Sequence, residues 1–307
     1  MREHRLAAAT AVATFALLVV GGLVHATGSS LACPDWPLCY GQFFPPMKGG
    51  ILFEHGHRLV ALCVLSLTVA LATLVFRRRP EPALRRLAAL AMALVLVQAS
   101  LGALTVLFKL PLLVSSGHLA TSMAFFSLVI YLAFRLDPRP PEAEAAPRRL
   151  VGAAALLVYA QIVLGAFVRH TGAGLACNVE LPFCAGGQLW PAWGPAQLHM
   201  AHRIAGVLVA LLVIAAAAAP LLAAARGRHR ARFLLAVAGP VLVLLQVALG
   251  LLTVTSYVSI PMVTLHLAAG AALLADQVAL FLALGGRPAP ATHRSGARSR
   301  SLAQAHG

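Results

Sequence analysis

Charged side chains are scarce in this sequence of 307 residues: they make up only 11%, and just nine of them are acidic. Ordinary globular domains carry about 25% charged residues, because their surface faces water. Here 60% of the residues are apolar and the mean hydropathy is +0.85. This composition does not fit a soluble domain and predicts an integral membrane protein.

Long apolar runs recur along the chain. About 20 apolar residues in a helix cover a hydrocarbon core of roughly 30 Å. Helices are the expected form, because a helix satisfies its own backbone hydrogen bonds where water is absent. The sequence predicts spans at about 6–26, 55–76, 84–107, 113–134, 150–170, 197–224, 232–255 and 260–284.

The net charge of +15 would suggest a nucleic-acid partner in a soluble protein, so the location of the basic residues decides its meaning. Most arginines fall in the termini or in the even-numbered loops between predicted spans. The opposite loops, around 27–53 and 171–196, carry little basic charge. By the positive-inside rule we expect both termini to be cytoplasmic, and we expect no nucleic-acid partner.

The two halves of the chain repeat one another. Segment 27–33 matches 171–177, and 98–106 matches 246–254, with offsets between 144 and 148 residues. Each copy holds an even number of spans, so both copies enter the membrane from the same side. The expected fold class is all-α: an integral membrane protein with eight transmembrane helices arranged as two tandem parallel four-helix bundles.

The repeat also sets the expected domains. They are an N-terminal bundle at 1–136, a Pro-rich cytoplasmic linker at 137–149, a C-terminal bundle at 150–286 and a basic tail at 287–307. The N-terminal run could be taken for a signal peptide, but the second copy begins with the same plan deep inside the chain.

Glycines within the spans are expected to permit close helix contacts; they include Gly21, Gly102, Gly165, Gly206 and Gly250.

Each copy places histidines near the outer start of its second and fourth spans. These are His57 and His118 in the first copy, and His202 and His266 in the second. All lie at similar depth, given a rise of about 1.5 Å per residue. Facing helices of a bundle build cofactor sites from such side chains, and two imidazoles at equal depth suit the axial positions of one haem iron.

Other interpretations of these residues remain open. A single histidine in a helix is more often a hydrogen-bonded packing residue, although ionisable residues inside membranes are usually functional. Zinc is a weaker alternative, because closely spaced ligands are absent. Arg58 and Arg203 each follow a histidine, and they could bind haem propionates or extend to lipid headgroups.

Four of the five cysteines lie in two outer loops: Cys33 and Cys39 in the first, Cys177 and Cys184 in the third. In an oxidising compartment we expect a disulfide within each loop, limiting the movement of the loop over its bundle. A redox relay is the alternative, since such a disulfide can be reducible. Cys63 is expected to be a small buried apolar residue.

The halves differ chemically at one position. Glu54 lies three residues before His57, so the two side chains share a helix face, whereas His199 stands there in the second copy. A partly buried glutamate beside a haem could accept or donate a proton. The alternative is a surface carboxylate paired with Arg58.

The run from Thr27 to Gly41, TGSSLACPDWPLCYG, followed by Glu54-x-x-His57-Arg58, resembles the bacterial haem A synthase family. The resemblance covers nearly the whole chain. It implies a membrane haem-dependent oxidoreductase of the plasma membrane that uses a haem B cofactor. The reaction would oxidise the C8 methyl of haem O to the formyl of haem A, a step of haem biosynthesis for cytochrome oxidase assembly.

The resemblance also implies roles for individual residues. His202 and His266 match the family's ligands of the cofactor haem. His57 and His118 match the histidines of the substrate half, and Glu54 matches the catalytic glutamate. The second cysteine loop departs from the pattern, because its pair is one residue wider and it lacks the Pro-Asp-Trp-Pro run.

The expected partners are haem O and membrane lipid, with haem O synthase (a farnesyltransferase) and an unidentified electron donor as candidates. A homo-oligomer is left open. Two other functional classes also remain open. One is a bis-histidine dihaem membrane cytochrome that only transfers electrons, for which the histidine pairs are enough. The other is a transporter or haem-handling protein, which the parallel repeat disfavours.

Overall fold

The computed structural model describes residues 1–138, 148–226 and 230–286, so most of the predicted linker and the whole predicted tail lie outside the described residues. In the described part, eight helices are long and apolar enough to cross a membrane. They are α1 (Arg2–Ala26), α2 (Gly50–Arg78), α3 (Pro82–Leu107), α4 (Leu112–Leu136), α5 (Arg148–His170), α6 (Gly194–Arg226), α7 (Arg230–Thr255) and α8 (Ile260–Gly285). The predicted all-α class with eight spans is confirmed, and the chain is a multi-pass membrane protein.

Prolines help to set where the helices begin. Pro82 and Pro261 lie in the first turn of α3 and α8, and Pro111 precedes α4. The fixed φ of proline suits a helix start, and the N–H that it lacks has no helical partner there. Because the starts of α4 and α8 are set in this way, His118 and His266 both fall on the second turn.

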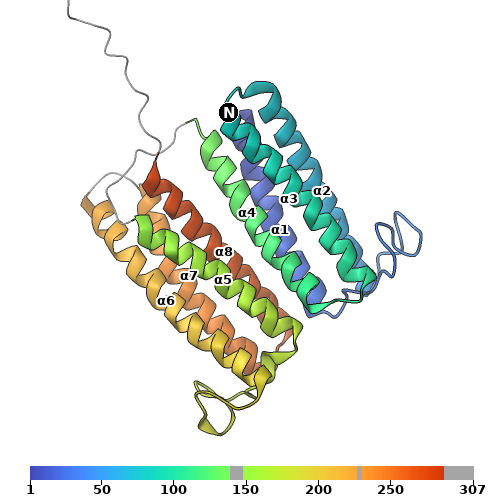
Figure 1. The fold of residues 1–307 in the computed structure, drawn as a ribbon, viewed down its shortest axis with the longest axis vertical. Coiled ribbons are helices and arrows are strands. Elements are labelled where there is room, and N and C mark those ends of the chain that lie inside the picture. The colour runs from blue at the N-terminus through green and yellow to red at the C-terminus, as the bar shows by residue number, and fades with distance from the viewer. Residues whose placement is uncertain (139–147, 227–229, 287–307) are drawn as a thin grey trace, which may run out of the picture.

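Helices pack in the same order in both halves. In the first, α1 and α3 each pack against α2 and α4; in the second, α5 and α7 each pack against α6 and α8. Figure 1 shows these two groups of four side by side. Between the groups, α8 contacts α1 and α4, and α4 also contacts α5. The contacts agree with two four-helix units, while their boundaries in the chain remain a proposal.

The segments 27–49 and 171–193 connect helices at the same end of the molecule, which we call the loop face (Figure 1). Each segment contains one of the predicted disulfides, Cys33–Cys39 and Cys177–Cys184. All four cysteines are buried. The second segment also holds two short 3₁₀ helices, η1 (Ala173–Leu175) and η2 (Ala185–Gly187).

Apolar side chains fill both groups of helices. One core cluster extends from the second half to Leu18, Met123 and Phe126 of the first, so the halves share packed side chains at their interface. Many other large apolar side chains are exposed, as a lipid-facing surface allows. Cys63 is exposed too, so the prediction that it is buried was wrong. A helix that is apolar on every side does not reveal which face points inward.

Candidate functional site

The four predicted histidines all lie on the second or third turn of their helices, close to the loop face. His57 and His118 come from α2 and α4, and His202 and His266 come from α6 and α8. Each is partly buried. The structure therefore brings the histidines of each half to similar depth.

In the first half, a glycine of the neighbouring helix lies against each histidine. A Cβ atom added to Gly21 of α1 would lie 3.0 Å from Cε1 of His57. One added to Gly102 of α3 would lie 3.4 Å from Cε1 of His118. Glycine lets the two backbones approach because it has no side chain to fill this space.

The second half repeats this arrangement. The corresponding distances are 3.0 Å between Gly165 of α5 and His202, and 3.1 Å between Gly250 of α7 and His266. Every one of the four imidazoles is thus seated in a notch left by a glycine. These glycines were expected from the sequence to permit close helix contacts, whereas the histidines are seen as their partners only in the structure.

The rings of His202 and His266 are neighbours within the second group, in an edge-to-face arrangement with centroids 6.5 Å apart and planes at 73°. Two imidazoles that bind one metal ion from opposite sides, each with a metal–nitrogen distance of about 2 Å, have centroids roughly 6 Å apart. The separation suits two axial ligands of one iron. Nδ1 of His266 is buried without a hydrogen-bond partner among the described residues.

In the first half, Nδ1 of His57 and Nδ1 of His118 are likewise buried, with no hydrogen-bond partner in the described part of the chain. A buried polar atom without a partner is costly, and a bound metal would remove that cost. Together with the glycine notches, these ring nitrogens fit a haem in each half.

Three glutamines contact the histidines, at a backbone carbonyl or at the ring. Nε2 of Gln98 donates to the carbonyl of His118 at 2.8 Å, and Nε2 of Gln161 donates to that of His202 at 2.8 Å. Nε2 of Gln246 lies 3.3 Å from Nε2 of His266. Gln98 and Gln246 belong to the repeat. Gln161 was missed, because its position in the first copy is occupied by Leu17, although a polar residue within an apolar span was a usable signal.

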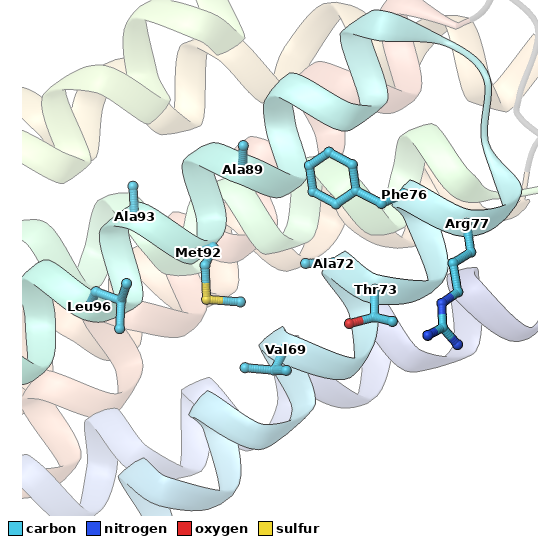
Figure 2. A pocket seen from close by; sticks show the side chains of 9 residues that line it. All are labelled: Val69, Ala72, Thr73, Phe76, Arg77, Ala89, Met92, Ala93 and Leu96. Atoms are coloured by element: carbon cyan, nitrogen blue, oxygen red, sulfur yellow. The ribbon is translucent and has the colours of Figure 1, made fainter.

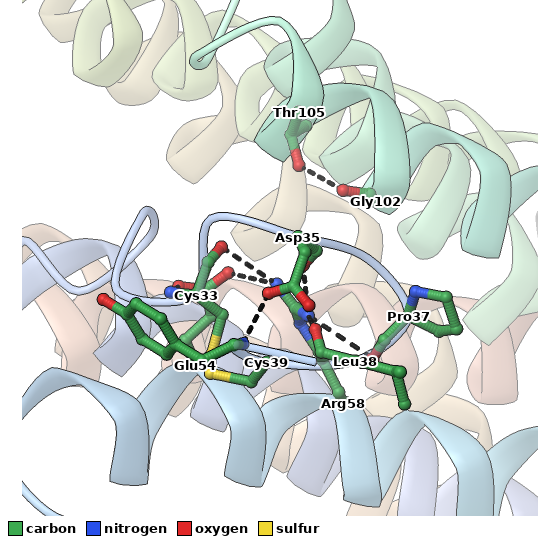
Figure 3. Close-up of polar contacts among 10 residues, drawn as sticks. Cys33, Asp35, Pro37, Leu38, Cys39, Glu54, Arg58, Gly102 and Thr105 are labelled. Carbon is green, nitrogen blue, oxygen red and sulfur yellow. Dashed lines mark hydrogen bonds and ion pairs between the residues drawn. A yellow bond between two sulfur atoms is a disulfide. The ribbon is translucent and has the colours of Figure 1, made fainter. Parts of the chain in front are cut away.

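Glu54 is buried at the start of α2, and its carboxylate points into the first loop (Figure 3). Oε2 accepts a hydrogen bond from the backbone N–H of Cys33 at 2.7 Å. Oε1 accepts one from Nη2 of Arg58 at 2.7 Å, forming an ion pair. Two interpretations of Glu54 were left open by the sequence: a partly buried carboxylate that transfers protons, and a surface carboxylate paired with Arg58. In the structure Glu54 is buried and is also paired with Arg58.

Arg58 holds the first loop in place. Its Nη1 donates to the carbonyls of Asp35 and Leu38, at 2.7 and 2.5 Å, as Figure 3 shows. Neither of the functions expected for this arginine, binding a propionate or reaching a headgroup, describes these contacts. The guanidinium instead ties the disulfide loop and Glu54 to the same turn of α2.

Arg203 plays the same part in the second loop. Its Nη1 donates to the carbonyls of Glu180 and Phe183, at 2.9 and 3.0 Å. Its Nε lies 3.3 Å from Nε2 of His199, the residue that replaces Glu54 in this half. The loop contacts are therefore repeated, but the carboxylate is present only in the first half.

Asp35 fastens the tip of the first loop. The backbone N–H groups of Gly41 and Tyr40 donate to its carboxylate at 2.8 and 2.6 Å, and they hold the pKa of Asp35 below its ordinary value. These hydrogen bonds lie within residues 27–41, the run that carries the family resemblance, and they stabilise its folded form.

A shallow groove of about 600 Å³ lies elsewhere, between α2 and α3 toward the end opposite the loop face (Figure 2). Its lining is mostly apolar and includes Val69, Phe76 and Met92, with Arg77 at one edge. None of the four histidines is among the described residues that line it. The groove is therefore separate from the candidate site near the loop face.

Known proteins are similar to this chain over most of its length. A family model described as a cytochrome oxidase assembly protein (COX15-CtaA) matches residues 4–50 and 51–278. The haem A synthase of Bacillus pumilus (strain SAFR-032) is 34% identical over 221 residues, covering 67% of this chain and 71% of the relative. That of Symbiobacterium thermophilum is 34% identical over 218 residues, covering 67% and 71%. That of Shouchella clausii (strain KSM-K16) is 32% identical over 222 residues, covering 68% and 73%. The chain therefore belongs to the cytochrome oxidase assembly family that includes the bacterial haem A synthases.

Proposed function

We propose that this chain is a haem A synthase, which oxidises the C8 methyl of haem O to the formyl group of haem A. The proposal rests on one repeated arrangement: in each half, two imidazoles each pack against a glycine of the neighbouring helix. This arrangement offers two haem sites, and the family relationship favours one site for a substrate and one for a cofactor.

We assign the second half to a haem B cofactor held by His202 and His266. The 6.5 Å separation of their rings supports this assignment. A haem with two histidine ligands supplies one-electron transfer when bound. The contacts of Gln161 with Nδ1 of His202 and of Gln246 with Nε2 of His266 would keep the two ring planes oriented.

We assign haem O, the substrate, to the first half, between His57 and His118. The reason is that the carboxylate of Glu54 lies one turn before His57 on α2 and has no counterpart in the second half. Glu54 would take up or release a proton during oxidation of the methyl group. Arg58 and the N–H of Cys33 fix the position of that carboxylate.

The distribution of basic residues supports an orientation with the loop face outside and both termini in the cytoplasm of a bacterial plasma membrane. The disulfides at the loop face suit an oxidising outer compartment. We further propose that haem O synthase supplies the substrate, that a separate electron donor or acceptor serves the second half, and that lipid surrounds the helices.

The test is chromatography of haems extracted from cells that make haem O and also express this chain. We expect a haem bearing a formyl group to appear with the wild-type chain and to be nearly absent with Glu54→Gln. Haem O left unchanged, in cells whose purified chain carries two B haems, would instead establish the bis-histidine cytochrome that only transfers electrons.

A further inference from the structure

The first disulfide lies against a buried histidine that the proposed function does not use. His55 of α2 is only 3% exposed. One of its ring nitrogens and the Sγ atoms of Cys33 and Cys39 all lie within 4.8 Å of one another. Two sulfurs and an imidazole nitrogen form a ligand set that zinc commonly takes in proteins.

The hydrogen bonding of His55 leaves it ready to bind a metal. Its Nε2 lies 2.9 Å from the carbonyl oxygen of Phe43. A carbonyl can only accept, so Nε2 carries the proton and Nδ1 of the neutral ring carries a free lone pair. Nδ1 has no hydrogen-bond partner among the described residues. An N–H donated to a backbone carbonyl is also the usual outer partner of a metal-binding histidine.

We propose that, when its disulfide is reduced, the first loop forms a Cys33–Cys39–His55 site for zinc or a similar divalent cation. The disulfide would take up two electrons from a dithiol, which becomes a disulfide, or from a phosphine, which becomes a phosphine oxide. The two protons would come from the dithiol or from the water that supplies the oxygen of the phosphine oxide, giving two thiols. Metal binding would then release both thiol protons to solvent. The inference is independent of the haem chemistry proposed above.

Distances and charge both suit this site. Ligand atoms around tetrahedral zinc are roughly 3.5 to 3.8 Å apart, given the usual zinc–sulfur and zinc–nitrogen distances. Once the disulfide is reduced the two sulfurs would move apart to this separation, and the imidazole nitrogen, which lies within 4.8 Å of both, would need to approach them by about 1 Å. Two thiolates, a neutral imidazole and a divalent cation sum to zero charge, which a buried position tolerates. The N–H of Cys33 donates to Glu54, so the metal would hold the loop over Glu54 without the disulfide.

The second loop supplies a matched control within the same chain. Met200 stands where His55 stands in the first half, and it packs against Cys177 and Cys184. A thioether is a poor ligand for zinc, which prefers thiolate, imidazole and carboxylate. Among the described residues, no histidine or carboxylate joins the second pair of cysteines as a third ligand.

The experiment uses the full-length protein, purified in detergent and reduced with a phosphine. Zinc is added, excess metal is removed by gel filtration, and zinc content is measured by elemental analysis. Alkylation followed by mass spectrometry then gives the modification rate of each cysteine pair. We expect one zinc per chain and slower alkylation of Cys33 and Cys39, with Cys177 and Cys184 unaffected.

Two variants test the role of the third ligand. His55→Ala should raise the zinc dissociation constant by at least about tenfold, since even an outer-shell partner carries that much. Met200→His should extend the protection to the second pair. Equal protection of both pairs in the wild-type chain, or no bound zinc, would overturn the proposal even if neither variant folds. Unchanged zinc affinity in a folded His55→Ala chain would overturn it as well.

Discussion

His57 of α2 packs into a notch left by Gly21 of α1, with its Cε1 3.0 Å from the place where a Cβ on that glycine would stand. The same relationship holds at 3.0 Å between His202 and Gly165. A contact this close means that the imidazole must move if the glycine gains a methyl group. The glycines on α1 and α5 therefore help to set where each ring lies.

Replacing the notch glycines should disturb haem binding. We expect Gly165→Ala and Gly250→Ala to lower the low-spin haem B absorbance per purified chain, because the added Cβ displaces a ligand ring. Gly56→Ala and Gly117→Ala are the controls, since these helical glycines have nothing within 4 Å of an added Cβ. The controls should keep their haem, because alanine favours a helix by about 1 kcal/mol over glycine. Equal haem content in all four variants would refute the notch interpretation.

Substitutions in the two halves should give distinguishable phenotypes: loss of haem B in one case, and loss of product with haem B retained in the other. His202→Ala or His266→Ala removes an axial ligand, so the purified protein should lose most of its haem B absorbance. Glu54→Gln should keep haem B while formyl production falls by roughly 10² to 10⁴, the range for a lost acid–base group. Haem B that survives His202→Ala, or normal haem A from Glu54→Gln, would contradict the assignment of the halves.

Arg58→Lys should loosen the first loop and leave the second unchanged. Lysine has one ammonium group and cannot reach the carbonyls of Asp35 and Leu38 together with Glu54. We expect faster hydrogen exchange in 33–41 and faster reduction of its disulfide. Arg203→Lys should produce the same change only in the second loop. If neither loop changes its exchange rate, the arginines do not hold these loops.

Both cysteine pairs should resist labelling until they are reduced. In sealed membranes whose loop face is outside, a membrane-impermeant alkylating reagent should modify Cys33, Cys39, Cys177 and Cys184 only after reductant is added. Cys63 should stay unlabelled, because it is exposed on α2 within a predicted span, where we expect lipid to keep the water-soluble reagent away. Labelling of all four loop cysteines without reductant would contradict the disulfides.

The first loop should lose order in acid. Hydrogen bonds from Gly41 and Tyr40 hold the pKa of Asp35 below its ordinary value, so the carboxylate stabilises the folded loop. That stabilisation is complete above the unfolded pKa of about 3.9 and is lost as the pH falls through the lower folded pKa. Proteolysis of the loop should accelerate over that range. Asp35→Asn should be more sensitive at neutral pH and less dependent on pH, and unchanged behaviour would exclude this role.

Much of the architecture could be predicted from the sequence. Apolar length alone located the eight spans, because crossing lipid requires about 20 residues in a helix. Regular helical rise placed His57, His118, His202 and His266 at similar depth. The repeat identified Glu54 as the residue that the second half lacks. These features depend on position along one helix or on comparison of two segments, so they need no knowledge of how helices pack.

The contacts between helices were not predictable in the same way. In lipid, every face of a helix is apolar, so periodicity does not show which side turns inward; Cys63 was misplaced for this reason. The loop carbonyls of Asp35 and Glu180, which accept hydrogen bonds from Arg58 and Arg203, lie 23 residues away in the sequence. The sequence determined the helices, their length and the depth of the histidines. Only the tertiary structure decided that each histidine rests on a glycine and that each arginine holds a loop, because both depend on the rotation and close approach of neighbouring segments.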